Sequence, residues 1–182
     1  RLSSKRLAKK VMLKVLNRPL LDLMIERLKQ INFVKSIIIA TTTNKEDDEI
    51  ANLASNSGVK FFRGSERDVL GRVAHAATEN MTDIVVQITG DTPLVDKKVT
   101  ENIIEFYISN QNKYDFVSND IGFYNESFKQ EFPLGLSAKV FDSSLLLKIE
   151  KITNNPIDRE HVVNYILKNH KKYRICNFKA EK

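Results

Sequence analysis

Cysteine is almost absent from this chain of 182 residues, and so are several features that would assign it to a large class of proteins. The single cysteine, Cys176, cannot form a disulfide within the chain, and it excludes metal sites built from several cysteines. No apolar run approaches the roughly 20 residues that a membrane-spanning helix needs. No signal-peptide pattern is present either, so we expect a cytoplasmic protein with no membrane partner.

Motifs for several common kinds of catalysis are also lacking. The sequence has no glycine-rich loop ending in Gly-Lys-Ser/Thr, which argues against P-loop ATPase chemistry. It has no His-Glu-x-x-His motif and no nucleophile elbow with Ser, His and Asp in order, so covalent catalysis has no candidate. The hydrophobic fraction of 42% and the charged fraction of 29% are those of an ordinary globular domain.

Positive charge is concentrated at one end of the chain. The formal net charge is +6, from 29 Lys and Arg against 23 Asp and Glu. Residues 1–18 contain seven of these basic residues and no acidic residue, which leaves the rest of the chain nearly neutral. A local cluster indicates an anionic ligand at one place, rather than the broad basic surface of a nucleic-acid-binding protein. We therefore expect no nucleic-acid partner.

Helical and strand patterns alternate along the chain. Amphipathic segments with helical spacing are separated by short apolar runs that are typical of buried strands. This βα alternation predicts a three-layer α/β domain of Rossmann-like type, with a mostly parallel sheet covered by helices on both faces. The expected helices are 20–31, 46–57, 66–80, 97–110, 143–152 and 159–169, and the expected strands are 36–41, 59–62, 83–89, 115–118, 137–141 and 173–178.

One segment interrupts the alternation. Residues 120–136 contain Gly122, Pro133 and Gly135, and we expect an excursion there, such as a hairpin. Otherwise the sequence predicts a single domain over residues 1–182. A phosphate loop in this type of fold usually follows the first, central strand, and no strand precedes Arg1. We therefore expect the chain to be truncated at both ends and its first strand to be missing.

The basic N-terminal segment is the first candidate site. Arg1, Arg6 and Lys10 lie within one short loop, and Ser3 and Ser4 add hydroxyl donors. Cationic side chains, hydroxyl groups and backbone N–H groups can together wrap a triphosphate. By spacing alone, a disordered basic arm fits equally well.

A carboxylate that follows a buried strand is the second candidate. Asp91 comes directly after Gly90, at the edge where open α/β sheets bind ligands. Gly90 would allow close backbone approach, Pro93 would fix the turn, and Asp91 could bind Mg²⁺, which takes one or two carboxylates plus phosphate oxygens. By pattern alone, an ordinary Asp turn, or a cap for the helix that starts near Asp96, is favoured.

A third candidate precedes the expected helix 66–80. Gly64 and Ser65 could contact a base or ribose, and Asp68 and Arg72 lie on the polar face of that helix. The alternative is structural: Ser65 would only cap the helix, and Asp68 and Arg72 would only form a surface ion pair.

Five blocks in order resemble a known family. Arg1-x-x-Ser4-x-Arg6-Leu7-x-x-Lys10 is similar to the Arg-x-x-Ser-x-Arg-Leu-Pro-Gly-Lys loop of cytidylyltransferases that make CMP-activated acidic sugars. The other four blocks resemble the subgroup named for the spore coat polysaccharide biosynthesis protein SpsF, and the match covers nearly the whole chain. They are Phe62-Arg63-Gly64-Ser65-Glu66-x-Asp68-Val69-Leu70-x-Arg72, Ile88-Thr89-Gly90-Asp91-x-Pro93-Leu94-x-Asp96, Pro133-x-Gly135-Leu136 and Arg159-Glu160-His161-Val162.

The resemblance implies a nucleotide-diphospho-sugar transferase fold and a CTP-dependent sugar cytidylyltransferase. A sugar hydroxyl would attack the α-phosphorus of CTP and pyrophosphate would leave. Catalysis would be electrostatic, with Arg6, Lys10 and Asp91 as catalytic groups and Asp91 as the magnesium ligand. The nucleotide-binding residues would be Arg1, Ser3, Ser4, Arg6, Lys10, Gly64, Ser65, Asp68, Arg72 and Gly90.

The excursion at 120–136 is rich in aromatic residues for a segment outside the regular elements. Aromatic residues are enriched at interfaces, and the resemblance implies dimers that pair through this region. We therefore expect a homodimer. The aromatic residues concerned are Phe123, Tyr124, Phe128 and Phe132.

The chain departs from the family pattern in two places. Ala8-Lys9 replaces a Pro-Gly pair, and Leu134 and Ser137-Ala138-Lys139 stand where the subgroup has polar or acidic residues, as in Gly-Leu-Asp-Val-Glu. A further metal-binding Asp of the family would lie beyond Lys182. Two alternatives therefore stay open: a nucleotidyltransferase with another nucleotide or acceptor, and a catalytically impaired nucleotide-binding protein of the same fold. The acceptor sugar cannot be assigned.

Overall fold

The computed structural model describes residues 1–2, 7, 9–133 and 135–180. Its helices are α1 (Leu20–Leu28), α2 (Asp48–Asn56), α3 (Val69–Glu79), α4 (Lys97–Ser109), α5 (Ser143–Ile152), α6 (Pro156–Glu160) and α7 (Asn164–Lys168). Short 3₁₀ helices lie at η1 (Lys10–Met12), η2 (Lys45–Asp47) and η3 (Ile121–Phe123). The strands are β1 (Lys14–Val15), β2 (Arg18–Pro19), β3 (Ile38–Thr42), β4 (Lys60–Gly64), β5 (Ile84–Gln87), β6 (Phe116–Ser118), β7 (Lys139–Asp142) and β8 (Ile175–Asn177).

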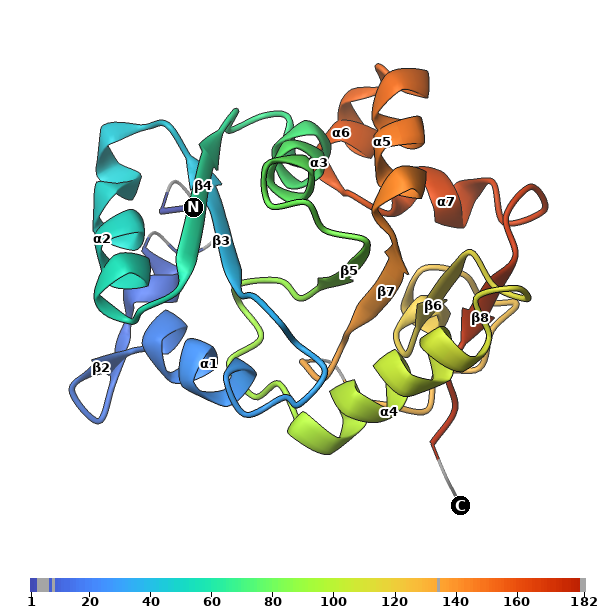
Figure 1. Cartoon of the computed structure of the whole chain (residues 1–182), viewed down its shortest axis with the longest axis horizontal. Helices are drawn as coiled ribbons and strands as arrows, with labels where there is room; N and C mark the ends of the chain where they lie inside the picture. The colour runs from blue at the N-terminus through green and yellow to red at the C-terminus, as the bar shows by residue number, and fades with distance from the viewer. Residues whose placement is uncertain (3–6, 8, 134, 181–182) are drawn as a thin grey trace.

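The strands form a parallel pair and a mixed sheet. β3 pairs with β4, and a four-stranded sheet has the order β5-β7-β6-β8 (Figure 1). β6 and β8 are parallel, and β7 runs antiparallel to both of its neighbours. β5, β6 and β8 therefore share one direction, so the sheet is mostly parallel, as expected, with β7 as its antiparallel strand. Parallel neighbours need a long crossover, usually a helix. The described part of residues 120–136 contains no α-helix that could carry the chain back to the other edge of the sheet. β7 therefore starts at the edge where β6 ends, and it runs in the opposite direction.

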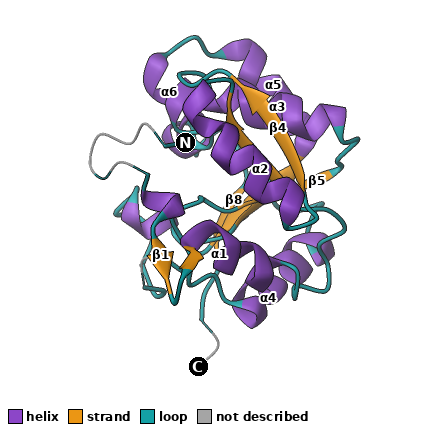
Figure 2. Cartoon of the chain, turned by 90° about the vertical axis from the view of Figure 1, so that its left-hand side faces the viewer, coloured by secondary structure: helices purple, strands orange, loops and turns teal. Residues whose placement is uncertain are grey.

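Helices cover both faces of the strands (Figure 1). One apolar core lies between α1, α4 and the strands, and its buried members include Ile25, Ile103 and Val140. A second core on the other face joins α3, α5 and α7 to β6 and β7, around Leu70 and Ile149. The turned view shows α2 lying across β4 (Figure 2). Helix–strand–helix layering of this kind is what the βα pattern predicts.

The expected helix at 159–169 is two helices. Asn155 accepts a hydrogen bond from the backbone N–H of Ile157, and Pro156 occupies the first turn, so α6 begins earlier than expected. His161 ends α6 in an extended conformation and α7 starts three residues later. Asn-Pro is a helix start signal that periodicity alone does not reveal.

Two further segments differ from the expectation. Residues 14–19 form the β1–β2 hairpin, which the sequence analysis did not predict, through a turn in which Leu16 and Asn17 have φ of 52° and 63°. Two consecutive residues with positive φ are typical of a two-residue hairpin turn, but Leu is rare there and gave no signal. The excursion after β6 contains η3 and irregular turns, and its described residues form no hairpin of strands.

None of the helices in the described part of the chain is long and apolar enough to cross a membrane. The expected first strand ahead of Arg1 stays a prediction.

Candidate functional site

Two candidate segments that lie far apart in the sequence meet in the structure. Lys10 lies in η1, and its Nζ donates a hydrogen bond of 2.9 Å to Oδ2 of Asp91. Asp91 sits in the turn that follows β5, whose last residue is Gln87. Both side chains are about 40% exposed, so a ligand from solvent can reach them. The basic segment and the strand-end carboxylate therefore form one site.

The Lys10 contact keeps Asp91 ionised. Partial burial alone would raise the pKa of the Asp91 carboxyl, but hydrogen bonds from Lys10 and Thr89 outweigh it and lower the pKa below the usual value. An ionised carboxylate is the form that binds a divalent cation. Asp91 thus carries the right charge for that role at any pH near neutrality.

The start of the chain is anchored by a buried aspartate that the sequence analysis missed. Leu2 is buried, and its backbone N–H donates to Oδ1 of Asp47 at 2.8 Å. The other carboxylate oxygen accepts hydrogen bonds from the hydroxyls of Thr41 and Thr42 and from the N–H of Thr42. These three residues lie at the end of β3 and in η2, and they fix where the basic segment begins. A Thr-Thr pair at a strand end, followed by an Asp, was the available signal.

We expect Asp47→Asn to lower the free energy of unfolding by about 1–2 kcal/mol, because an amide nitrogen would replace an oxygen that accepts hydrogen bonds from donors. The bonds from Thr42, Leu2 and Thr41 outweigh burial and lower the pKa of Asp47. Its stabilisation is therefore present at neutral pH and is lost as the pH falls through that lowered pKa. Urea unfolding from pH 7 to pH 3 should show a smaller pH dependence in the variant; equal slopes would contradict this account.

The other sequence candidates in the first ten residues are only partly described. Arg1 donates to the backbone oxygen and carboxylate of Glu66, and its second terminal nitrogen lies 3.5 Å from Oε1 of Glu160. Ser3, Ser4 and Arg6 lie outside the described residues, so their predicted roles stay predictions.

The segment between β4 and α3 packs around a buried arginine. Gly64 ends β4, and a Cβ there would lie only 3.0 Å from Cγ of Arg72, so the close approach favours glycine. Arg72 is buried, and it donates from Nη1 to the backbone oxygen of Ser65. Its Nε has no hydrogen-bond partner among the described residues, and burial lowers the pKa of its guanidinium. Arg72 is therefore no exposed member of a surface ion pair.

Asp68 caps α3, a role that the sequence analysis considered for Ser65. The Asp68 carboxylate accepts from the N–H of Gly71 at 2.9 Å, and the helix begins at Val69 rather than at residue 66. The partner of Asp68 is Arg159, whose Nη1 lies 3.2 Å away, and not Arg72 as the structural alternative supposed. Arg159 also contacts Glu150 at 2.8 Å, so α5, α6 and the start of α3 are joined.

The alternative readings of the Asp91 turn can also be examined. Asp96 itself caps α4, since its Oδ1 accepts from the N–H of Val99 at 2.8 Å. Asp91 is thus not required as a cap. Gly90 has open space around it, because a Cβ there would meet only Val11 at 3.7 Å. The close backbone approach that the sequence analysis expected of Gly90 is not imposed by the protein itself.

Asp91 fits a magnesium ion that is shared with a ligand. No cluster of three or more His, Cys, Asp or Glu side chains that could hold a metal occurs among the described residues. Mg²⁺ in nucleotide sites is commonly bound by one or two carboxylates while phosphate oxygens and water supply the rest. Asp91 could supply the one carboxylate of such a donor set, since it is ionised and reachable from solvent.

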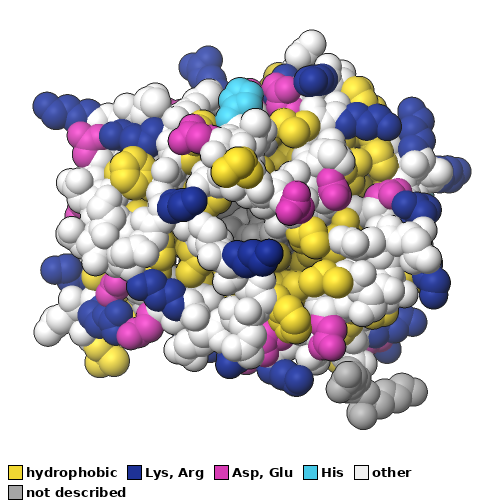
Figure 3. Space-filling model, viewed as in Figure 1, with side chains coloured by type: hydrophobic (Ala, Val, Ile, Leu, Met, Phe, Trp, Pro, Cys, Tyr) yellow, Lys and Arg dark blue, Asp and Glu magenta, His cyan; other side chains and the backbone are white. Residues whose placement is uncertain are grey.

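Charges of both signs are interspersed over the face shown in Figure 3. Asp and Glu side chains lie among the Lys and Arg side chains, and no broad basic field covers this view. A nucleic-acid-binding surface is typically a continuous basic stripe or patch.

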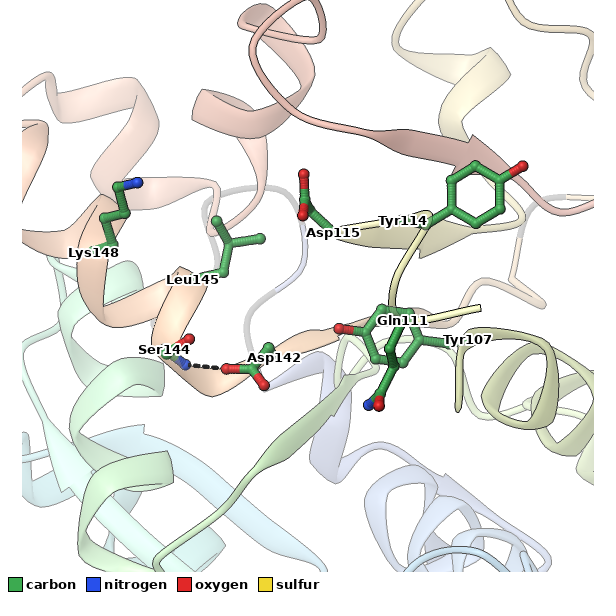
Figure 4. Close-up of a pocket in the computed structure, with 8 residues that line it drawn as sticks. All are labelled: Tyr107, Gln111, Tyr114, Asp115, Asp142, Ser144, Leu145 and Lys148. Carbon is green, nitrogen blue, oxygen red and sulfur yellow. Dashed lines mark hydrogen bonds between the residues drawn. The ribbon is translucent and has the colours of Figure 1, made fainter. Parts of the chain in front are cut away.

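A hollow of about 330 Å³ lies at the end of the strands opposite Asp91 (Figure 4). Asp115 precedes β6 and Asp142 ends β7, so this hollow is at the edge away from Asp91. Its carboxylates are engaged in the structure: Asp142 accepts from the N–H of Ser144, and Asp115 pairs with Arg174. The hollow is therefore not a continuation of the site at Asp91.

Comparison with known proteins decides the family. The model of the cytidylyltransferase family matches residues 1–181. The chain belongs to the cytidylyltransferase family. An uncharacterized protein of Methanocaldococcus jannaschii is 38% identical over 175 residues, which are 96% of this chain and 67% of that protein. The spore coat polysaccharide biosynthesis protein SpsF of Bacillus subtilis is 28% identical over 180 residues, which are 96% of this chain and 70% of that protein.

A solved structure shares the fold over the whole chain. A cytidylyltransferase from Leptospira borgpetersenii is 32% identical and superposes with a TM-score of 0.91, covering 100% of this chain and 73% of the other. The expected Rossmann-like α/β fold class is therefore confirmed, with β7 as its antiparallel strand. The resemblance to cytidylyltransferases and to SpsF is confirmed as well, and with it an activity of CTP-dependent cytidylyl transfer.

Proposed function

We propose that this cytidylyltransferase transfers CMP from CTP to a hydroxyl of an acidic or surface-polysaccharide sugar and releases pyrophosphate. The observation that carries the proposal is the contact between Lys10 and Asp91 at the carboxyl end of β5. It brings together a cation that could bind phosphate and a carboxylate that could bind a metal, from segments 81 residues apart. The name of the relative from Bacillus subtilis supports a sugar that enters a polysaccharide.

The residues divide the work between binding and charge stabilisation. Lys10, with Arg1 and Arg6, would hold the triphosphate, and Ser3 and Ser4 would add hydroxyl donors. The segment of Gly64, Ser65, Asp68 and Arg72 would bind the nucleoside, since it borders the N-terminal segment through the contact of Arg1 with Glu66. Negative charge grows on the phosphate as pyrophosphate leaves, and preorganised cations stabilise it without reorganisation.

Asp91 would hold a divalent cation, which we propose to be Mg²⁺. When bound, the ion would neutralise phosphate charge at the reacting centre. In its absence Asp91 is neutralised by Lys10 instead, at 2.9 Å. When nucleotide and metal bind, the contact between Lys10 and Asp91 would therefore be replaced. Lys10 would contact a phosphate and Asp91 would contact the metal.

Release of pyrophosphate tests this function. Protein with CTP, Mg²⁺ and a set of nonulosonic acids and other acidic and neutral sugars should release pyrophosphate with at least one acceptor. Parallel reactions with ATP, GTP and UTP should be at least about tenfold slower. Faster release from another nucleotide would favour the alternative nucleotidyltransferase, and CTP binding without release from any acceptor would favour an impaired binding protein.

We also propose that the protein is a homodimer that pairs through residues 120–136. Phe123 and Tyr124 are exposed in the isolated chain, as an interface would need. Phe128 instead packs against the chain's own second core, Phe132 stacks on Phe178, and Lys139 Nζ lies 5.8 Å from the centre of the Tyr124 ring. Three of the four aromatic residues therefore have partners within the chain. Light scattering at micromolar concentration should give twice the mass of one chain; the mass of a monomer would contradict the proposal.

A further inference from the structure

A row of polar side chains crosses the four-stranded sheet at the edge that carries Asp91. Gln87 is opposite Lys139, Lys139 is opposite Ser118, and Ser118 is opposite Asn177 in the strand registers. Directly opposite residues of neighbouring strands project from the same face of a sheet. The four side chains therefore line one face of the sheet, whose strand order is β5-β7-β6-β8.

Three members of the row are buried and hydrogen-bonded, and Gln87 is partly buried. Lys139 and Ser118 are 5% and 0% exposed. Lys139 Nζ lies 2.5 Å from Oδ2 of Asp120, and the hydroxyl of Ser118 donates to Oδ1 of the same carboxylate at 2.6 Å. Asn177 accepts from the N–H of Ile121 and donates to a backbone oxygen.

One atom of the row lacks a partner. Oε1 of Gln87 is buried and accepts no hydrogen bond from the described residues. An unsatisfied buried acceptor costs about 1–3 kcal/mol, so a stable protein seldom keeps one without a use. Its cross-strand neighbour Lys139 has three N–H donors, of which one is directed to Asp120.

These two groups together define the chemistry of a ligand. A hydroxyl group can donate to Gln87 Oε1 and accept from Lys139 Nζ at the same time. A carboxylate has no hydrogen to give to Gln87, and it would meet the negative charge of Asp120, which already neutralises Lys139. The pair therefore fits a neutral hydroxyl group and not an anionic one.

The row lies beside the site of phosphate transfer. Gln87 ends β5, and Asp91 is in the turn that follows it. Tyr124 connects the two places: Lys139 Nζ lies 5.8 Å from the centre of its ring. Burial and then the charges of Asp120 and Asp91 raise the pKa of the Tyr124 hydroxyl, as expected for a group near both carboxylates. An aromatic ring next to hydrogen-bonding groups is a common surface for the C–H face of a sugar.

We infer that Gln87 and Lys139 bind a hydroxyl group of a polyhydroxylated sugar, the acceptor of the proposed transfer, and that Lys139 determines which sugar is accepted. The inference rests on the proposed function only in identifying the bound sugar as the acceptor of the transfer. Asp120 positions Lys139, and Tyr124 covers the bound ring. The row leaves any carboxylate of the sugar to be recognised elsewhere.

Gln87→Met is the decisive variant, because a structural role and a binding role predict opposite results. Methionine has nearly the same length and removes the unsatisfied oxygen, so the melting temperature should stay equal or rise. Sugar affinity should nevertheless fall about tenfold, the loss of one hydrogen bond, with the affinity for CTP unchanged. Lys139→Met combined with Asp120→Asn, which avoids leaving a buried charge unpaired, should lower sugar affinity at least as much.

Saturation-transfer NMR can measure this with glucose, galactose, mannose and their uronates as probes. Lys97→Met is the control, since Lys97 is exposed on α4 and pairs with Glu101. We expect at least one hexose or uronate to bind the wild type and the control, and to bind Gln87→Met about tenfold more weakly. Equal binding of these probes to Gln87→Met and to the wild type, or no binding of any probe, would overturn the inference.

The same titrations separate this inference from the proposed function. A wild type that binds a hexose through Gln87 but binds no CTP would refute the proposed function and keep the hydroxyl site. A wild type that binds CTP but none of the six sugars would refute the hydroxyl site alone.

Discussion

Asp91→Asn should reduce turnover at least about 100-fold and leave the fold intact, which is the scale of losing one electrostatic partner of a transition state. A triphosphate at the proposed site would bring several negative charges to the carboxyl end of β5, where an unshielded carboxylate would repel them. We therefore propose that Asp91 acts there as a ligand for a cation. Asparagine keeps the shape and one oxygen but lacks the charge, so the steady-state rate of pyrophosphate release should fall while the melting temperature changes little.

A matched control lies at the other end of the same strand. Asp83 precedes β5 and is exposed, so Asp83→Asn removes the same charge from a place away from the site. It should keep near-normal turnover. If Asp91→Asn also kept near-normal, magnesium-dependent turnover, Asp91 would be a turn residue and the metal site would have to be sought elsewhere.

Arg6→Ala and Lys10→Ala should each weaken CTP binding by about 1–3 kcal/mol, the range for losing a hydrogen bond to a charged group. This corresponds to roughly 5- to 150-fold in the dissociation constant. Lys14→Ala is the control for charge alone, because Lys14 lies exposed in β1 of the same basic segment. Calorimetric titration with CTP should show weaker binding in the Arg6→Ala and Lys10→Ala variants than in Lys14→Ala. Unchanged CTP affinity in both the Arg6 and Lys10 variants would refute the phosphate-binding role.

Lys10→Ala should also change the response to acid. The bond from Lys10 is one of the contacts that lower the pKa of Asp91, so its loss moves that pKa upward. The ionised form of Asp91 would then be lost at a higher pH as the solution is acidified. The acid limb of magnesium-dependent CTP binding should therefore shift to higher pH in this variant. If the acid side of the pH profile does not shift, the pH dependence of CTP binding reflects the titration of a group other than Asp91.

Local patterns predicted most of the elements, because the signals for them lie within a few residues of one another. The apolar run before Thr42 and the helical spacing of Leu21, Met24 and Leu28 both produced the expected structure. The direction of β7 was beyond such patterns. It depends on whether a helix carries the chain back between β6 and β7, and residues 120–136 provide only irregular turns there.

The sequence can indicate a candidate site residue when its type and its place after a strand are enough to suggest a role. It cannot reveal a feature of the site that depends on a contact between distant residues. The position of Asp91 after a buried strand and Gly90 indicated its place at the sheet edge. Its pairing with Lys10 joins residues 81 positions apart, and no spacing rule reveals it. The row of Gln87 and Lys139 depends on strand register, because a shift by one residue would turn these side chains to the other face.

Calorimetric titration of CTP with and without Mg²⁺ tests the central claim most directly, namely that CTP binds between the basic segment and Asp91 together with a divalent cation. Wild-type protein should bind CTP at least about tenfold more tightly with Mg²⁺ than with a chelator, and Asp91→Asn should lose most of that difference. ATP, GTP and UTP should bind more weakly than CTP under the same conditions. Equal CTP affinity with and without Mg²⁺, or the same magnesium effect in Asp91→Asn, would contradict the account.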